Sequence, residues 1–126
     1  MADASARSYA AGVIDGDGHI GMPQRGTIRV VVANTNKTLI DWLTAHFYGG
    51  SVTKESFRNL KWKSAYYWTL QGISARLFLQ EIAPYLTIKR DRALLAIEAD
   101  QHHPRAQNSY RALFRALNAR GAQKEA

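Results

Sequence analysis

The chain has 126 residues and no cysteine, which excludes a disulfide scaffold, a cysteine-liganded zinc site and a thiol nucleophile. Seventeen Lys and Arg against ten Asp and Glu give a net charge of +7 and a pI near 10.0, which favours nucleic acid over a membrane surface as the partner. No apolar run approaches the roughly 18 residues of a membrane span, and the N-terminal residues have no features of a targeting signal. We therefore expect one soluble, intracellular domain over residues 1–126.

The first predicted element is a helix of small residues over 5–15, which ends at Gly16 and Gly18. Residues 20–22 and 27–34 are predicted to pair as a hairpin around the turn-prone residues 23–26. In the second strand the residues alternate between two faces, one formed by Ile28, Val30 and Val32 and the other by Thr27, Arg29 and Val31. A helix follows from about residue 38, with Leu39, Leu43 and Phe47 on one stripe and Gly49-Gly50 at its end.

The second half repeats this order. Strands are predicted over 51–54 and about 65–71, joined by a basic loop. Ser74 is expected to cap a helix whose Leu77, Phe78 and Ile82 face inward, and Pro84 marks its end. Another helix is predicted to about residue 99, broken by His102-His103-Pro104, and a last amphipathic helix ends before Gly121 and carries Tyr110, Leu113, Phe114 and Leu117. Two hairpins with helices between them predict an α+β fold, with one antiparallel sheet covered on one face.

The basic excess lies downstream of residue 50, where Arg58, Lys61 and Lys63 alternate with aromatic side chains. Such a mixture suits phosphate contacts and base contacts together. A solvated basic surface whose aromatic residues turn into the core explains the same pattern equally well.

Residues 10–18 have the sequence AAGVIDGDG, which resembles the motif of the LAGLIDADG homing endonucleases. Six of the nine positions are identical, namely Ala11, Gly12, Ile14, Asp15, Asp17 and Gly18. The hairpin, the NTNKTLIDWL segment, the Gly49-Gly50 pair and the PYLTIKRDRA segment follow in the order of that family. The resemblance covers roughly residues 8–98 and implies an αββαββα fold with a saddle-shaped four-stranded sheet; residues from about 105 to 121 would form a helical extension.

Independently of the resemblance, small residues at positions 10–12 allow two helices to approach closely. Asp17 falls at the negative end of its helix dipole, where a cation is favoured, and a carboxylate among backbone carbonyls suits Mg²⁺. An EF-hand is excluded because Ile20 stands where that loop needs glycine. For Asp15 we favour a capping or turn-forming role over metal binding.

The resemblance implies a role for each of five residues. Asp17 would bind the divalent metal together with the Gly16 carbonyl, and Asn34 would position a water. Lys89 would assist at the scissile phosphate, with Lys37 as a further basic candidate. The implied cofactor is Mg²⁺, with Mn²⁺ or Ca²⁺ as substitutes that support binding.

One chain carries one motif, so the resemblance implies a homodimer whose two copies each supply one Asp17. The expected dimer contacts are Ala10, Ala11, Gly12, Val13 and Asp15. The open sheet face and the hairpin loops are expected to contact double-stranded DNA, through His19, Gly21, Gln24, Arg25, Thr27, Arg29, Val31, Lys54, Arg58, Asn59, Lys61, Lys63, Tyr67, Thr69 and Gln71. A shift of the last strand by one residue would exchange Trp68 for Thr69 on that face.

The leading hypothesis is a homing endonuclease that cuts a long pseudo-palindromic target. Two alternatives remain on the same fold: a maturase that binds intron RNA, and a non-catalytic, sequence-specific DNA-binding protein. The presence of both Asp17 and Lys89 argues against the non-catalytic protein.

Overall fold

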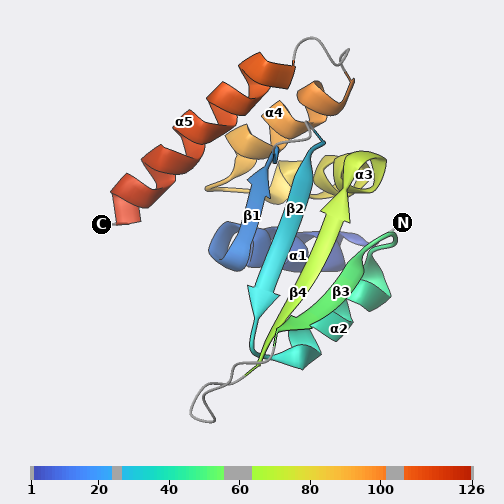
Figure 1. Ribbon diagram of the computed structural model, residues 1–126. Helices are drawn as coiled ribbons and strands as arrows, with labels where there is room; N and C mark the ends of the chain where they lie inside the picture. The colour runs from blue at the N-terminus through green and yellow to red at the C-terminus, as the bar shows by residue number, and fades with distance from the viewer. Residues whose placement is uncertain (1, 24–26, 56–63, 102–106, 126) are drawn as a thin grey trace.

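The computed structural model describes residues 2–23, 27–55, 64–101 and 107–125 (Figure 1). In chain order, the elements are α1 (Ala4–Asp17), β1 (Gly18–Gly21), β2 (Arg29–Asn34), α2 (Lys37–His46), β3 (Ser51–Glu55), β4 (Ala65–Gln71), α3 (Gly72–Ile82), the 3₁₀ turn η1 (Ala83–Tyr85), α4 (Arg90–Gln101) and α5 (Gln107–Glu125). None of the helices in the described residues is long and apolar enough to cross a bilayer.

The four strands form one antiparallel sheet in the order β1-β2-β4-β3. Helices α1 to α4 lie on one face of this sheet, which we call the covered face, and the opposite face is called the open face (Figure 1). Helix α5 lies beside the β1 edge and against α4. The predicted α+β class, with a four-stranded antiparallel sheet covered on one face, is confirmed.

The core lies between the covered face and the helices. Val30 and Val32 of β2 pair with Leu70 and Trp68 of β4, and all four side chains are fully buried. Strand alternation therefore puts Trp68 in the core and Thr69 on the open face, which settles the register of the last strand.

Several helix boundaries follow from local chemistry. The Asp3 and Asn36 side chains accept hydrogen bonds from the first turns of α1 and α2, as N-caps do. Gly49 has φ +95, a left-handed conformation that ends the α2 segment at low steric cost. Gly18 joins α1 directly to β1, and a Cβ there would lie 2.8 Å from the Ile14 Cα, so this junction requires glycine.

Three details of the sequence prediction are corrected. Helix α3 begins at Gly72 and has no side-chain cap, so Ser74 lies inside it. Leu77 and Leu113 are 53% and 51% exposed rather than inward-facing, since both lie on the outer sides of their helices. Helix α5 continues to Glu125, past Gly121. The expected break at His102-His103-Pro104 lies outside the described residues.

Candidate functional site

The C-terminal end of α1 brings Asp17 next to the end of β2. Asp17 is exposed, and its Oδ2 accepts a hydrogen bond of 3.2 Å from Asn34 Nδ2. Asn34 Oδ1 in turn accepts the backbone N–H of Asn36 at 2.8 Å, which fixes the amide at the start of α2. Two residues that the resemblance assigned to one site are therefore in contact, although they lie 17 positions apart.

Lys89 reaches the same end of α1 from the segment before α4. Its ammonium donates to the carbonyl of Ile14 at 3.0 Å and to the carbonyl of Gly18. The Ile14 carbonyl lies in the last turn of α1, where the helix dipole is negative, so a cation is stabilised there. Lys89 thus puts a positive charge beside the turn that carries Asp17.

Asp15 joins α1 to the segment before α4. Its carboxylate accepts three backbone N–H groups, from Thr87 at 2.8 Å, Ile88 at 3.1 Å and Lys89 at 2.9 Å. This is a capping role, as the residue type suggested, but it is made to a segment more than seventy positions away. The Asp15 carboxylate is thus occupied within the chain, and its expected contact with a second copy stays a prediction.

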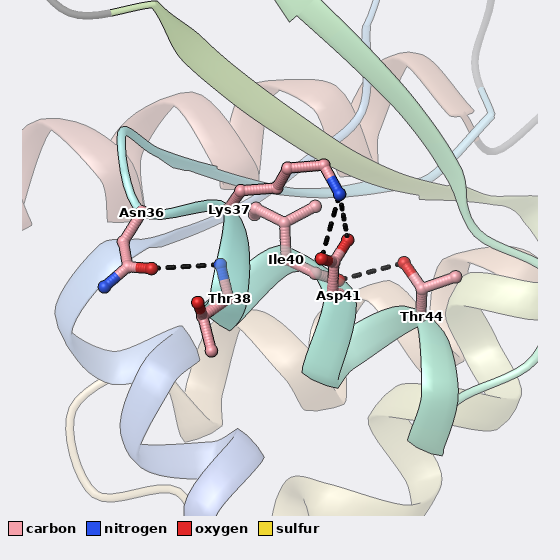
Figure 2. A network of polar contacts seen from close by, with 6 residues as sticks. All are labelled: Asn36, Lys37, Thr38, Ile40, Asp41 and Thr44. Atoms are coloured by element: carbon pink, nitrogen blue, oxygen red, sulfur yellow. Dashed lines mark hydrogen bonds and ion pairs between the residues drawn. The ribbon is translucent and has the colours of Figure 1, made fainter.

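Lys37 lies at the first position of α2, but its side chain runs along that helix. Its ammonium makes an ion pair of 2.9 Å with Asp41, one turn further on (Figure 2). The hydrogen bond to Asp41 and the charge of that carboxylate raise the pKa of Lys37. Among the described contacts none joins Lys37 to Asp17, so the structure does not bring this expected residue into the Asp17 site.

One protomer offers few metal ligands at this site. Asp17 supplies a carboxylate, and Gly16 is exposed, with no atom within 4 Å of the position of a Cβ. The described residues contain no group of three or more histidines or carboxylates that could hold a metal ion. The oxygen donors at Asp17 and Gly16 suit Mg²⁺ in kind, but a complete ligand set needs donors from outside the protomer.

The exposed face of α1 differs from the expected one. Ala10 and Ala11 have no exposed surface, because their side chains pack into the protomer core. Gly12 and Gly16 are exposed one turn apart with open space around them, and Val13 is half-buried. The small-residue surface available to a second copy is therefore formed by Gly12 and Gly16, and Ala10 and Ala11 are removed from the expected dimer contacts.

Strand pairing puts most of the expected DNA contacts that lie in the described strands on the open face. The pairs His19–Val31 and Gly21–Arg29 join β1 to β2, and Arg29–Gln71 and Val31–Thr69 join β2 to β4. Tyr67 lies on the same face, and Thr27 is exposed two residues before Arg29. The pKa of His19 is lowered, chiefly because the imidazole is partly desolvated. The nearby positive charges of Arg29, Lys89 and Arg92 lower it further.

The expectation that Lys54 lies on the open face is wrong. Lys54 pairs with Tyr66 in β4, so it lies on the side of Trp68 rather than of Tyr67, and its ammonium is 5.8 Å from the centroid of the Tyr66 ring. The open face of β3 is formed instead by three residues that were not among the expected contacts, Ser51, Thr53 and Glu55. The alternation of β3 could have revealed them.

Glu55 accepts a hydrogen bond of 2.7 Å from the Tyr67 hydroxyl, which raises the pKa of Tyr67. The remaining expected contacts, Gln24, Arg25, Arg58, Asn59, Lys61 and Lys63, lie outside the described residues.

Among solved structures with this architecture are homing endonucleases bound to DNA. The homing endonuclease I-CvuI, in complex with the I-CreI target in the presence of magnesium, has a TM-score of 0.66 and 18% identity, over 88% of this chain and 80% of that chain. I-CvuI with its own target in the presence of calcium has a TM-score of 0.55 and 22% identity, over 73% of this chain and 63% of that chain. The archaeal intron-encoded homing endonuclease I-Vdi141I, complexed with DNA, has a TM-score of 0.54 and 11% identity, over 90% of this chain and 96% of that chain.

No protein-family model and no curated protein matches the chain. The similarity to the solved structures is one of fold. The chain has the fold of the LAGLIDADG homing endonucleases, as the motif at residues 10–18 predicted.

Proposed function

We propose that the chain is a site-specific DNA endonuclease of homing type, which hydrolyses phosphodiester bonds with a divalent metal and works as a homodimer on a pseudo-palindromic target. The observation that supports this most strongly is the contact between Asp17 and Asn34 beside the Lys89 charge. It lies at an exposed helix end, on a fold shared with DNA-bound homing endonucleases.

A second copy would complete the site. If α1 packs against α1 of the second copy through Gly12 and Gly16, the two Asp17 carboxylates approach each other at the paired helix ends. Open space at both glycines supports such a close approach. A twofold protein of this kind recognises half-sites related by the same symmetry.

Within this proposal the residues divide the work. Asp17 and the Gly16 carbonyl would hold Mg²⁺, which would supply activation of a water and neutralisation of charge on the phosphate oxygens. Asn34 fixes the orientation of the Asp17 carboxylate and positions a water. Lys89 stabilises the negative charge that develops on the attacked phosphate.

The open face would read the sequence of the duplex. Its central side chains, Tyr67, Thr69 and Gln71, are hydroxyl and amide groups of the kind that hydrogen-bond base edges in the major groove. A twisted antiparallel sheet presents such a row of side chains along the groove.

Incubation with a randomised duplex library and Mg²⁺, followed by sequencing of the cut ends, tests the proposal. Recovery of a pseudo-palindromic cut site from the wild type, and its loss in Asp17→Asn, would support it. Asp91→Asn is the matched control, because Asp91 is an exposed aspartate in the first turn of α4. Recovery of bound but intact duplex would favour the non-catalytic protein, and selective binding of intron RNA would favour the maturase; either result would overturn the proposal.

A further inference from the structure

A basic pocket lies between α5 and the open face at the β1 edge. It has a volume of about 160 Å³ and is lined by His19, Gly21, Met22, Pro23, Arg29, Arg111, Phe114, Arg115 and Asn118. Three arginines line one small space, and no aspartate or glutamate is among the lining residues. Like charges gathered in this way are stabilised by an anion between them.

Helix α5 is held against the sheet by apolar and polar contacts. Phe114 is 2% exposed and belongs to the core, and Asn118 donates to the Ile20 carbonyl at 3.4 Å. On the α4 side, Arg92 donates to the Leu117 carbonyl at 2.9 Å. Arg111 and Arg115 are one helical turn apart and flank Phe114, so the anchoring of Phe114 orients both toward β1 and β2.

Within the described residues, the arginines of this pocket have no ion-pair partner. The Arg29 Nε is buried and has no hydrogen bond, and Arg29, Arg111 and Arg115 make no ion pair with any other described residue. A buried donor without an acceptor is costly, and an oxyanion removes that cost. Glycine at position 21 has no side chain to fill the pocket. A Cβ at this position would lie 2.9 Å from the His19 Nε2 and crowd the imidazole.

We propose that this pocket binds one phosphate of the DNA backbone, so that α5 extends the nucleic-acid interface beyond the sheet. This inference rests on the proposed function. The pocket is at the Arg29 end of β2 and Asp17 contacts the Asn34 end, about 17 Å away along an extended strand. The phosphate is therefore distant from the bond that is cut, and the contact serves affinity and positioning rather than chemistry.

The proposal assigns Arg29 to the DNA backbone rather than to the bases. A guanidinium whose Nε is buried beside two further arginines suits a phosphate, which is the same at every base pair. Reading of the bases then falls to residues in the middle of β4, such as Tyr67 and Thr69.

Measurement of duplex affinity against KCl concentration tests this inference. The proteins are the wild type, Arg111→Gln, Arg115→Gln and the double variant; the probes are the duplex recovered from the library and one of unrelated sequence. Because the pocket in each copy of the proposed dimer binds one phosphate, the double variant should weaken binding to both duplexes equally. It should make the logarithmic salt slope shallower by about 1.8, that is, about 0.9 for each copy. Arg115→Lys should keep most of the slope, since the charge is retained. Arg76→Gln is the matched control, because Arg76 pairs with Asp100 between the helices.

The outcomes separate the two proposals. A wild type that binds no duplex at any salt concentration overturns the proposed function. If the wild type binds duplex and the double variant has the same salt slope, only the proposal that the pocket binds a phosphate is overturned. Stabilisation of the wild type by inorganic phosphate together with that unchanged slope would identify a site for free anions and also overturn it. Arg29→Gln should weaken binding to duplexes of every sequence to the same extent. An altered base preference in this variant would overturn the assignment of Arg29 to the phosphate. Equal melting temperatures of the variants exclude misfolding as the cause.

Discussion

The Asp15 carboxylate accepts the backbone N–H of Lys89 at 2.9 Å, across 74 positions of the chain. The Lys89 ammonium returns to the carbonyls of Ile14 and Gly18, on either side of the turn that carries Asp17. The two acidic residues of the motif therefore have different roles. Asp15 holds Lys89 in place from within the protomer, and Asp17 remains exposed at the candidate site.

Asp15→Asn should lower the free energy of unfolding by about 1–2 kcal/mol, because a neutral amide caps three backbone N–H groups less well than a carboxylate does. Asp17→Asn should change it by less than about 0.5 kcal/mol, since Asp17 is exposed. Urea denaturation of both variants checks this. Equal losses of stability would contradict the division of tasks between the two aspartates.

Lys89→Met should slow cleavage at saturating protein by about 10²- to 10³-fold, the range found when one donor to a developing negative charge is removed. Lys89→Arg keeps the charge and should recover part of the rate. Single-turnover cleavage separates this effect from binding, and a circular dichroism melt controls for the loss of the bonds to α1. An unchanged rate in Lys89→Met would exclude Lys89 from the chemistry.

Gly12→Leu should convert the proposed dimer into a monomer, because the leucine side chain would keep the two α1 helices apart. Ala45→Leu is the matched control, since it adds the same side chain at an exposed position of α2. Sedimentation equilibrium with and without duplex gives the oligomeric state. A wild type that stays monomeric on DNA would show that α1 does not pair.

Gly18→Ala should destabilise the protomer by about 1–3 kcal/mol, because its Cβ would lie 2.8 Å from the Ile14 backbone. Gly16→Ala, two residues earlier, should stabilise the protomer by up to about 1 kcal/mol, since the site is open and alanine favours helix. Thermal unfolding at concentrations that keep the protein monomeric compares them. Equal effects of the two substitutions would contradict the close approach at Gly18.

Tyr67 should titrate above its ordinary pKa of 10.0, chiefly because its hydroxyl donates to Glu55. The folded state thus favours the protonated phenol, so this contribution to stability is complete below pH 10.0 and is lost as the pH rises through the folded pKa. Glu55→Gln should lower the pKa of Tyr67 and, by removing a negative charge from the open face, strengthen duplex binding slightly. NMR titration of the tyrosine ring carbons measures the shift, with Glu81→Gln as the control.

Local pattern determined much of this fold. The alternation of Ile28, Val30 and Val32 in the sequence predicted which face of β2 is buried, and the structure confirms it. The predicted strand over 65–71 coincides with β4. The motif at residues 10–18 predicted the fold, and the wider resemblance assigned Asp17 and Asn34 to one site, where their side chains are in contact. These features depend on the periodicity of one element or on a segment that resembles a known family. Periodicity and resemblance can both be recognised from the sequence without knowing which distant segments come into contact.

Other features were decided only in three dimensions. A helix made almost wholly of small residues has no clear apolar stripe, so the sequence could not show that Ala10 and Ala11 face the core while Gly12 and Gly16 face outward. The partners of Asp15 and the orientation of Arg111 and Arg115 depend on segments that meet only after the chain has folded. Periodicity within a helix or strand predicts which residues share one face of that element. Packing between elements that are distant in the sequence decides what that face contacts.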